Sequence, residues 1–162
     1  MGRIVAAAVY SQGKKVTDIE LSQGSAWAAK PEHFVWIGLQ QPDAAQLHSL
    51  QQQFQLHDLA ISEALEQHSR PKLETFGDAL FMVLYAPTRR AGKLEFIETH
   101  LFAGKGYVIS ARYGDSTPYS QVRQSCEARP LLLAHGEEFV LYALLSFIVD
   151  TYRPVTEKIN LE

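Results

Sequence analysis

The sequence predicts an α/β fold in which a mixed parallel and antiparallel sheet has helices on both faces, as an αβα sandwich. Strand-like runs, two helical stretches, more strand-like runs and further helical stretches follow one another along the chain. An unbroken apolar run at residues 79–85 is typical of a strand that is covered on both faces. The chain has 162 residues with 46% hydrophobic content, which suits one folded domain spanning residues 1–162.

The N-terminal part of the chain is predicted to be mostly strands. Two β-prone runs, at residues 4–10 and 16–21, are separated by a polar glycine-containing turn and therefore predict a hairpin. Glycine, serine and proline predict a loop over residues 22–33, and a third strand follows at 34–39. The period then changes to that of a helix over residues 43–54.

A second helix is predicted over residues 58–67, because an acidic residue, Asp58, suits the positive end of a helix. We assign its core side to Ala60, Ile61, Ala64 and Leu65, and its polar side to Ser62, Glu63, Glu66 and Gln67. This assignment predicts that Glu63 points away from the core. Pro71 disfavours helix at the residue before it and marks the exit into a strand.

The remainder of the chain is predicted to be strands followed by helices. Strands are expected at residues 72–75, 79–85, 94–103 and 107–111. A third helix is expected at 119–128, and an almost wholly apolar fourth helix from Glu137 should be deeply packed. Pro154 should kink or break that fourth helix. The helical pattern is cut off at Glu162, which predicts a chain truncated before further helix.

Composition argues against several classes of function. The formal charge is -3 and the basic residues are scattered, so no nucleic-acid partner is expected. The longest apolar run, at residues 139–149, is far shorter than the roughly 20 residues that span a bilayer, so the chain as given is expected to be soluble. Cys126 is the one cysteine and is interpreted as a small core hydrophobe.

No motif points to an enzyme. Gly104-Lys105-Gly106 lies between two predicted strands and opens no helix, so it is not expected to hold a dinucleotide phosphate. His57 and His68 bracket one helix but lie about three turns apart, so a zinc site would need ligands from elsewhere. Glu98 and His100 share one strand face, which is interpreted as a partly solvated face rather than an acid-base pair.

Several short motifs that follow one another in a fixed order tell more about the family of this chain than any one motif does. They are, in chain order, Trp36-Ile37-Gly38-Leu39, Phe54-Gln55-Leu56-His57, Arg70-Pro71-Lys72-Leu73-Glu74, Leu80-Phe81-Met82-Val83-Leu84, Glu98-Thr99-His100-Leu101-Phe102 and Ile148-Val149-Asp150. Together they resemble the cytoplasmic domain of CorA-type magnesium and cobalt transporters, in the CorA/ZntB-like metal ion transporter superfamily, over residues 34–162.

The resemblance implies a domain that precedes a long stalk helix and two transmembrane helices in a funnel-shaped homopentamer. It would lie at the cytoplasmic face of the bacterial inner membrane and would not be an enzyme. Its implied role is to sense cytoplasmic Mg2+ and bias the attached pore, through weak divalent sites between neighbouring subunits. Mg2+ prefers oxygen ligands and keeps several waters, so one or two carboxylates suit such a site.

The resemblance implies two metal-site residues, Glu63 and Asp150. The family's E-D pair falls on Ser62 and Glu63, so one carboxylate of that pair is missing here. Asp150 matches the family's V-D position, although Arg153 lies three residues on and could pair with it. The partner acids of the stalk are absent from the sequence, so weak Mg2+ binding is expected of this chain alone. Arg70 and Lys72 are interpreted as cations that complement a helix end or pair with Glu66 or Glu74.

Two alternatives remain open at this point. One is the corresponding domain of a Zn2+ transporter of the same superfamily, with Co2+ or Zn2+ as transported ions. The other is a free-standing α/β enzyme or interaction module.

Overall fold

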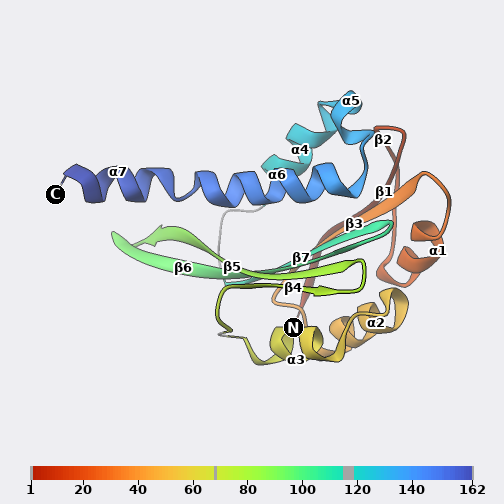
Figure 1. The fold of residues 1–162 in the computed structure, drawn as a ribbon, viewed down its shortest axis with the longest axis horizontal. Helices are drawn as coiled ribbons and strands as arrows, with labels where there is room; N and C mark the ends of the chain where they lie inside the picture. The colour runs from red at the N-terminus through yellow and green to blue at the C-terminus, as the bar shows by residue number, and fades with distance from the viewer. Residues whose placement is uncertain (1, 68, 115–118, 162) are drawn as a thin grey trace.

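A seven-stranded mixed sheet lies at the centre of the computed structural model, which describes residues 2–67, 69–114 and 119–161 (Figure 1). The order of the strands across the sheet is β2-β1-β3-β7-β6-β5-β4. Their bounds are β1 (Arg3–Ser11), β2 (Lys14–Asp18), β3 (His33–Gln40), β4 (Lys72–Phe76), β5 (Ala79–Arg90), β6 (Lys93–Gly104) and β7 (Tyr107–Tyr113).

The pair β3 and β7 is parallel, and every other pair of neighbouring strands is antiparallel. The predicted mixed sheet is therefore confirmed. The chain leaves these two parallel strands toward opposite faces, because β3 leads into α2 (Ala44–Phe54) and α3 (Asp58–Glu66) whereas β7 leads to α4 (Ser120–Glu127). The carboxyl ends of β3 and β7 consequently mark a topological switch point, where the following segments cover opposite faces of the sheet.

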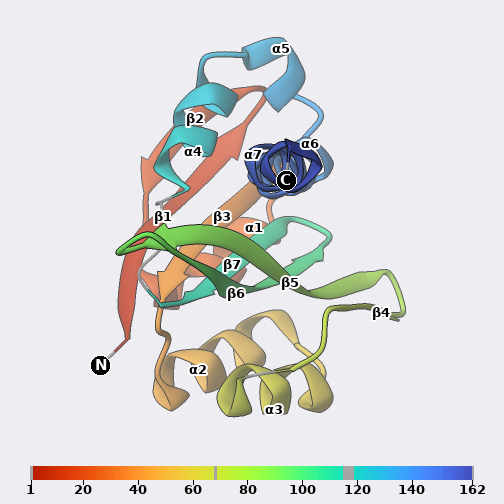
Figure 2. The same cartoon turned by 90° about the vertical axis from the view of Figure 1, so that its left-hand side faces the viewer.

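Helices cover both faces of the sheet, as predicted (Figure 2). Leu47, Ile61 and Ala64 of the α2–α3 layer share one core with Val35 and Ile109 of the sheet. The α4, α5 and α6 helices form the second core on the other face. The bounds of the helices are α1 (Gly24–Ala28), α2 (Ala44–Phe54), α3 (Asp58–Glu66), α4 (Ser120–Glu127), α5 (Pro130–Leu133), α6 (Glu137–Asp150) and α7 (Arg153–Leu161), with the 3-10 turn η1 (Leu21–Gln23) before α1.

The interpretation of Cys126 as a core residue is confirmed, since it is buried among the side chains of the second core. Burial raises the pKa of its thiol to about 11. A thiol that is this hard to ionise is a poor nucleophile at neutral pH.

The predicted loop over residues 22–33 is wrong in its first half, which forms η1 and α1. Glu20 and Gln23 form a reciprocal capping box that starts the helical turns. Gly24 lets α1 approach α2, because a Cβ atom there would lie 2.9 Å from the Phe54 ring. The glycine that suggests a loop in the sequence therefore serves close packing between helices.

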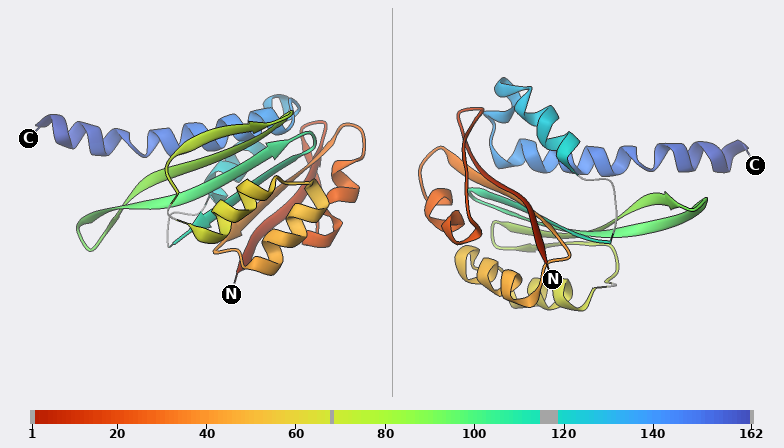
Figure 3. Two further views of the ribbon diagram at one scale, coloured as in Figure 1. Left: turned by 60° about the horizontal axis from the view of Figure 1, so that its bottom comes forward. Right: turned by 180° about the vertical axis from the view of Figure 1, so that it is seen from behind.

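The C-terminal helices and the β5–β6 hairpin extend from the same end of the molecule (Figure 3). Pro154 lies in the first turn of α7, just after the two-residue break that separates α7 from α6, so the predicted break is confirmed. The Tyr152 hydroxyl donates a hydrogen bond to the backbone carbonyl of Tyr85 in β5 and ties this junction to the sheet.

The expectation that the helix from Glu137 is deeply packed holds for one side only. Val140, Leu144 and Ile148 are buried, whereas Tyr142 and Val149 are each 66% exposed. Within the described residues, no helix is both long and apolar enough to cross a membrane.

Candidate functional site

Glu63 lies on α3, which packs on the β4–β5–β6 side of the sheet (Figure 2). The helix begins after His57, whose Nδ1 accepts a hydrogen bond from the backbone N–H of Leu59 at 3.1 Å. The His57 ring stacks on Phe76 of β4 with ring centroids 4.0 Å apart, which accounts for this histidine without a metal. His68, the other histidine of the zinc hypothesis, lies outside the described residues.

The prediction that Glu63 points away from the core is wrong. Its Oε1 accepts a hydrogen bond from Lys72 Nζ at 2.5 Å, and its side chain is 22% exposed. Its Oε2 is buried and has no hydrogen-bond partner in the described part of the chain. At 100° per residue Glu63 lies only about 60° from Ala60, on the border of the buried stripe. Leu65, which was assigned to the core side, is 40% exposed.

Lys72 is the counterion of Glu63 and comes from the first residue of β4. Its pKa is raised, chiefly by the hydrogen bond to Glu63 and with a contribution from Glu74, whose Oε1 is 3.6 Å from Nζ. The predicted pairing of Lys72 with Glu74 is confirmed. The shorter contact with Glu63 could not be read from the sequence, because it depends on how α3 docks on the sheet.

Glu98 and His100 form a second polar pair beneath α3. The prediction of a partly solvated face is wrong, since His100 is 0% and Glu98 is 5% exposed. Glu98 Oε1 and His100 Nε2 are 2.6 Å apart, which fits an imidazole that donates from Nε2 to the carboxylate. Burial lowers the pKa of His100, and the hydrogen bond to Glu98 opposes this shift.

The two pairs lie in one polar layer between α3 and the sheet. Strand register aligns Lys72 with Val83 and Val83 with His100, so the lysine and the histidine share a row and a face. The Tyr113 hydroxyl donates to the carbonyl of Ala64, at 2.9 Å, and fastens α3 over this row. The i, i+2 spacing of Glu98 and His100 in the sequence predicts that the two side chains share a strand face. It does not predict that they are buried, because that depends on α3 covering this face.

Asp150 lies far from this layer, at the C-terminal end of α6 on the opposite face of the sheet. It is exposed and lines a groove of about 390 Å³ between α4 and α6, together with Arg129 and Ser146. The structure therefore does not bring Glu63 and Asp150 together within one chain. Among the described residues, no group of three or more histidine, cysteine, aspartate or glutamate side chains could hold a metal ion.

Comparisons with known proteins give the family. The family model described as CorA-like Mg2+ transporter protein matches residues 31–162. The cobalt/magnesium transport protein CorA of Thermotoga maritima is 26% identical over 149 residues, 90% of this chain and 42% of that protein. YfjQ of Bacillus subtilis, named as a candidate metal ion transporter, is 27% identical over 125 residues, 77% of this chain and 39% of that protein. The chain thus spans about four-tenths of the length of these curated relatives.

Solved structures show the same fold. The full-length CmaX protein matches with a TM-score of 0.76 at 19% identity, over 97% of this chain and 48% of that one. The soluble domain of CorA from Methanocaldococcus jannaschii has a TM-score of 0.67 at 15% identity, over 96% of this chain and 60% of that one. The ZntB cytoplasmic domain from Vibrio parahaemolyticus has a TM-score of 0.66 at 17% identity, over 98% of this chain and 64% of that one. With its family match over most of its length and this shared fold, the chain belongs to the CorA-like Mg2+ transporter protein family.

Proposed function

We propose that this chain is the cytoplasmic metal-sensing part of a divalent-cation transporter of the bacterial inner membrane, with Mg2+ or Co2+ as the transported ion. The observation that carries the proposal is the family match over residues 31–162, supported by the shared fold. The family is described by transport and not by catalysis, so the chain is proposed to act by binding and not as an enzyme.

Glu63 is the proposed regulatory ligand, and Lys72 is the group with which a metal ion must compete. The carboxylate lies at the margin of α3, partly exposed, with one oxygen on the lysine ammonium at 2.5 Å. A divalent cation that approaches this oxygen meets a positive charge already in place. Binding to one such carboxylate, with waters completing the coordination shell, is necessarily weak. Weak binding suits a sensor of a cation that is abundant in the cell.

Asp150 is proposed as a second ligand that acts between subunits, because it is exposed on the face opposite α3. Metal ions that bridge neighbouring subunits would stabilise one arrangement of the assembly and thereby bias the pore. A homopentamer is the proposed assembly. Exposed apolar side chains on α7 support an assembly, since Ile159 is 64% and Leu161 is 88% exposed.

The test is transport by the full-length protein encoded by the native gene. In proteoliposomes, the protein should conduct Mg2+ or Co2+, and raised Mg2+ on the cytoplasmic side should reduce that flux. A reading frame that stops shortly after Glu162, or a full-length protein with no cation flux, would contradict the proposal.

A Zn2+ transporter is the second candidate, favoured by the fold match to the ZntB cytoplasmic domain. The same proteoliposomes discriminate between the candidates when Mg2+, Co2+ and Zn2+ are supplied separately. Zn2+ flux without Mg2+ flux would select the second candidate.

A further inference from the structure

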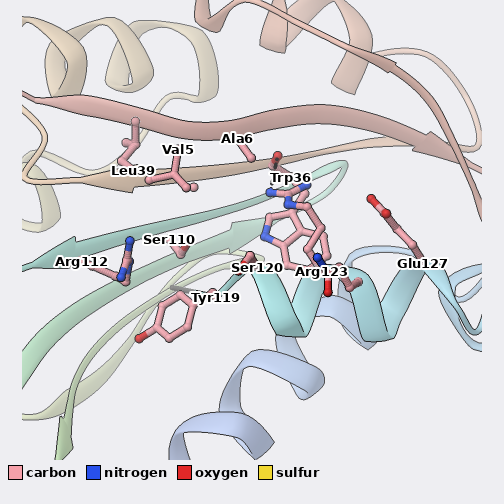
Figure 4. Close-up of a pocket in the computed structure, with 12 residues that line it drawn as sticks. Val5, Ala6, Trp36, Leu39, Ser110, Arg112, Tyr119, Ser120, Arg123 and Glu127 are labelled. Atoms are coloured by element: carbon pink, nitrogen blue, oxygen red, sulfur yellow. Dashed lines mark hydrogen bonds between the residues drawn. The ribbon is translucent and has the colours of Figure 1, made fainter. Parts of the chain in front are cut away.

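A cavity of about 180 Å³ lies between α4 and the sheet, and neither Glu63 nor Asp150 lines it (Figure 4). Three small residues lie side by side on its sheet side, because Ala6 of β1 pairs with Gly38 of β3 and Gly38 pairs with Ser110 of β7. Residues of α4 line the other side. Since bulky side chains occupy most other positions on this face of the sheet, the row of small residues accounts for the hollow.

Gly38 leaves room that a side chain could occupy. A Cβ atom built there would lie 3.7 Å from Ser110 Oγ and 4.0 Å from Arg123 Nη2, both ordinary contact distances. Gly38 is a regular residue within β3 and is not among the glycines with positive φ, so its backbone does not demand glycine. The missing side chain at Gly38 therefore opens the cavity directly beside the Ser110 hydroxyl.

The Ser110 side chain is a buried polar group that is available to a ligand. Ser110 is only 3% exposed, and it lines the cavity from β7. None of the hydrogen bonds within the described residues uses its hydroxyl. A hydroxyl that is removed from bulk water without a partner is unfavourable, and a ligand that bonds to it relieves that cost. A serine hydroxyl can both donate and accept, so it suits a neutral polar group.

The charged side chains that line the cavity are already engaged. Arg123 of α4 donates from Nη1 to the Tyr10 hydroxyl at 2.9 Å and from Nη2 to the Trp36 carbonyl at 3.3 Å. The Tyr10 hydroxyl in turn donates to Glu127 Oε1 at 2.7 Å. Arg112, which also lines the cavity, has interactions of its own. Because each of these charged groups has partners, the cavity favours a neutral ligand over an ion.

The other walls of the cavity suit an apolar ring. Val5 and Ala6 of β1 line the space together with Trp36 and Tyr119. The Tyr119 hydroxyl lies 2.6 Å from Thr99 Oγ1 and is therefore engaged outside the cavity. An apolar cavity of about 150 Å³ can hold benzene, so a volume of about 180 Å³ suits a single six-membered ring with one small substituent.

The cavity also lies where the fold provides for ligands. It is lined near the carboxyl ends of β3 and β7, the parallel pair from which the chain leaves toward opposite faces. In open α/β sheets, ligands bind in the crevice at such a switch point. The position in the fold and the unused hydroxyl of Ser110 thus point to the same place.

We propose that this cavity binds a small neutral aromatic molecule with one hydroxyl group, for which phenol is the simplest example. The ring occupies the space beside Gly38, against Trp36 and Tyr119, and the hydroxyl of the ligand forms a hydrogen bond with Ser110. The site is separate from the proposed metal site on α3 and does not depend on transport.

The test is isothermal titration of phenol and of toluene into the 162-residue chain and into Ser110→Ala. The two ligands have nearly the same size, and they differ in carrying a hydroxyl or a methyl group. The parent chain should bind phenol saturably. One net hydrogen bond between neutral groups corresponds to about fivefold in affinity, so the preference for phenol over toluene should fall about fivefold in Ser110→Ala.

Gly38→Leu locates the binding, because its side chain fills the space that the ring occupies. This variant should bind phenol at least about tenfold more weakly than the parent. Gly38→Ala is the matched control and should keep the phenol affinity within a few fold, since its methyl group meets only ordinary contacts. If Gly38→Leu does not fold, the comparison of Ser110→Ala with the parent decides.

Three results would overturn the proposal. They are no saturable binding of phenol by the parent chain, an unchanged phenol affinity in folded Gly38→Leu, and a preference for phenol over toluene that is the same in Ser110→Ala and in the parent.

Discussion

At the residue scale, the two polar pairs beneath α3 differ in their access to water, and this difference decides what each can do. Glu63 and Lys72 have side chains 22% and 29% exposed, so ions from solution can reach them. Glu98 and His100 are buried, with exposed fractions of only 5% and 0%, so dissolved ions do not reach them. Fully buried polar atoms without partners are costly, and His100 Nδ1 is one such atom within the described residues.

His100 should make the fold less stable in mild acid. Burial holds its folded-state pKa below the ordinary 6.5, so below about pH 6.5 the unfolded chain binds more protons than the folded one. Its contribution to stability is therefore present above pH 6.5 and is lost as pH falls toward the folded pKa. The loss can reach at most about 1.4 kcal/mol per pH unit, the limit for one proton.

The measurement is urea unfolding between pH 5 and 7 for the parent and for His100→Gln, which keeps a donor for Glu98. The difference in unfolding free energy between the two proteins should shrink as the pH is lowered. A difference that stays constant across this range would contradict the assignment of His100 as the titrating group.

Lys72 should weaken the metal response of the full-length protein. Replacing it in Lys72→Met removes the cation that holds Glu63 Oε1, so the midpoint for inhibition of flux by Mg2+ should move to lower concentration. Lys93→Met, at the exposed start of β6, is the matched control and should leave the midpoint unchanged. If Lys72→Met moves the midpoint upward, Lys72 does not compete with the ion.

At the element scale, hairpins that carry glycine at similar backbone angles differ in what surrounds them. Gly13 and Gly92 have φ of 80° and 79°. A Cβ atom at Gly13 would lie 2.1 Å from the Pro130 carbonyl oxygen of α5, whereas one at Gly92 would meet nothing within 4 Å. The first glycine therefore permits contact between the β1–β2 hairpin and α5, and the second serves only its own turn.

Alanine at the two positions should separate these effects. Gly92→Ala should cost about 1 kcal/mol of unfolding free energy, from the left-handed backbone alone. Gly13→Ala should cost at least about 1–3 kcal/mol more, because the hairpin must move away from α5. Urea unfolding of both variants provides the values, and equal losses would show that the close approach to Pro130 does not matter.

The sequence predicts elements well where the pattern is local and poorly where packing decides. The strand at β3 and the helix at α2 follow from the spacing of their apolar residues, and both are found. α1 was missed because its glycine is used for contact with Phe54, and the short α5 was missed because it spans one turn. The β5 strand runs beyond residue 85, where the apolar run ends, because its backbone stays paired with β6 as far as Arg90.

At the scale of the whole molecule, the order of elements and the doubly covered sheet could be predicted, because both follow from periodicity. The environment of the Glu63 side chain could not be predicted from the sequence. Glu63 lies at the border of the buried stripe of α3, and the direction of its side chain depends on the ion pair with Lys72 of β4. The burial of Glu98 and His100 likewise depends on α3 crossing their strand face. Side-chain environments of this kind arise only when distant segments meet.

The arrangement of the whole molecule also explains why this chain alone should sense metal weakly. The proposed ligands, Glu63 and Asp150, lie on opposite faces, so no single chain offers both to one ion. Isothermal titration of Mg2+ into the 162-residue chain should therefore show binding no tighter than the millimolar range, as expected for a single carboxylate with water ligands. Micromolar binding would mean that the chain contains a complete site and that the half-site account is wrong.

The most direct test of the central claim is the Mg2+ dependence of flux through the full-length protein carrying Glu63→Ala. Glu66→Ala, which removes an exposed carboxylate from the same helix, is the control for a general change in charge. If Glu63 is a regulatory ligand, Glu63→Ala shifts the Mg2+ midpoint for inhibition several-fold upward while Glu66→Ala leaves it near the parent value. If Glu63→Ala leaves the midpoint unchanged, Glu63 is a structural ion-pair partner of Lys72 and the proposed sensing role is wrong.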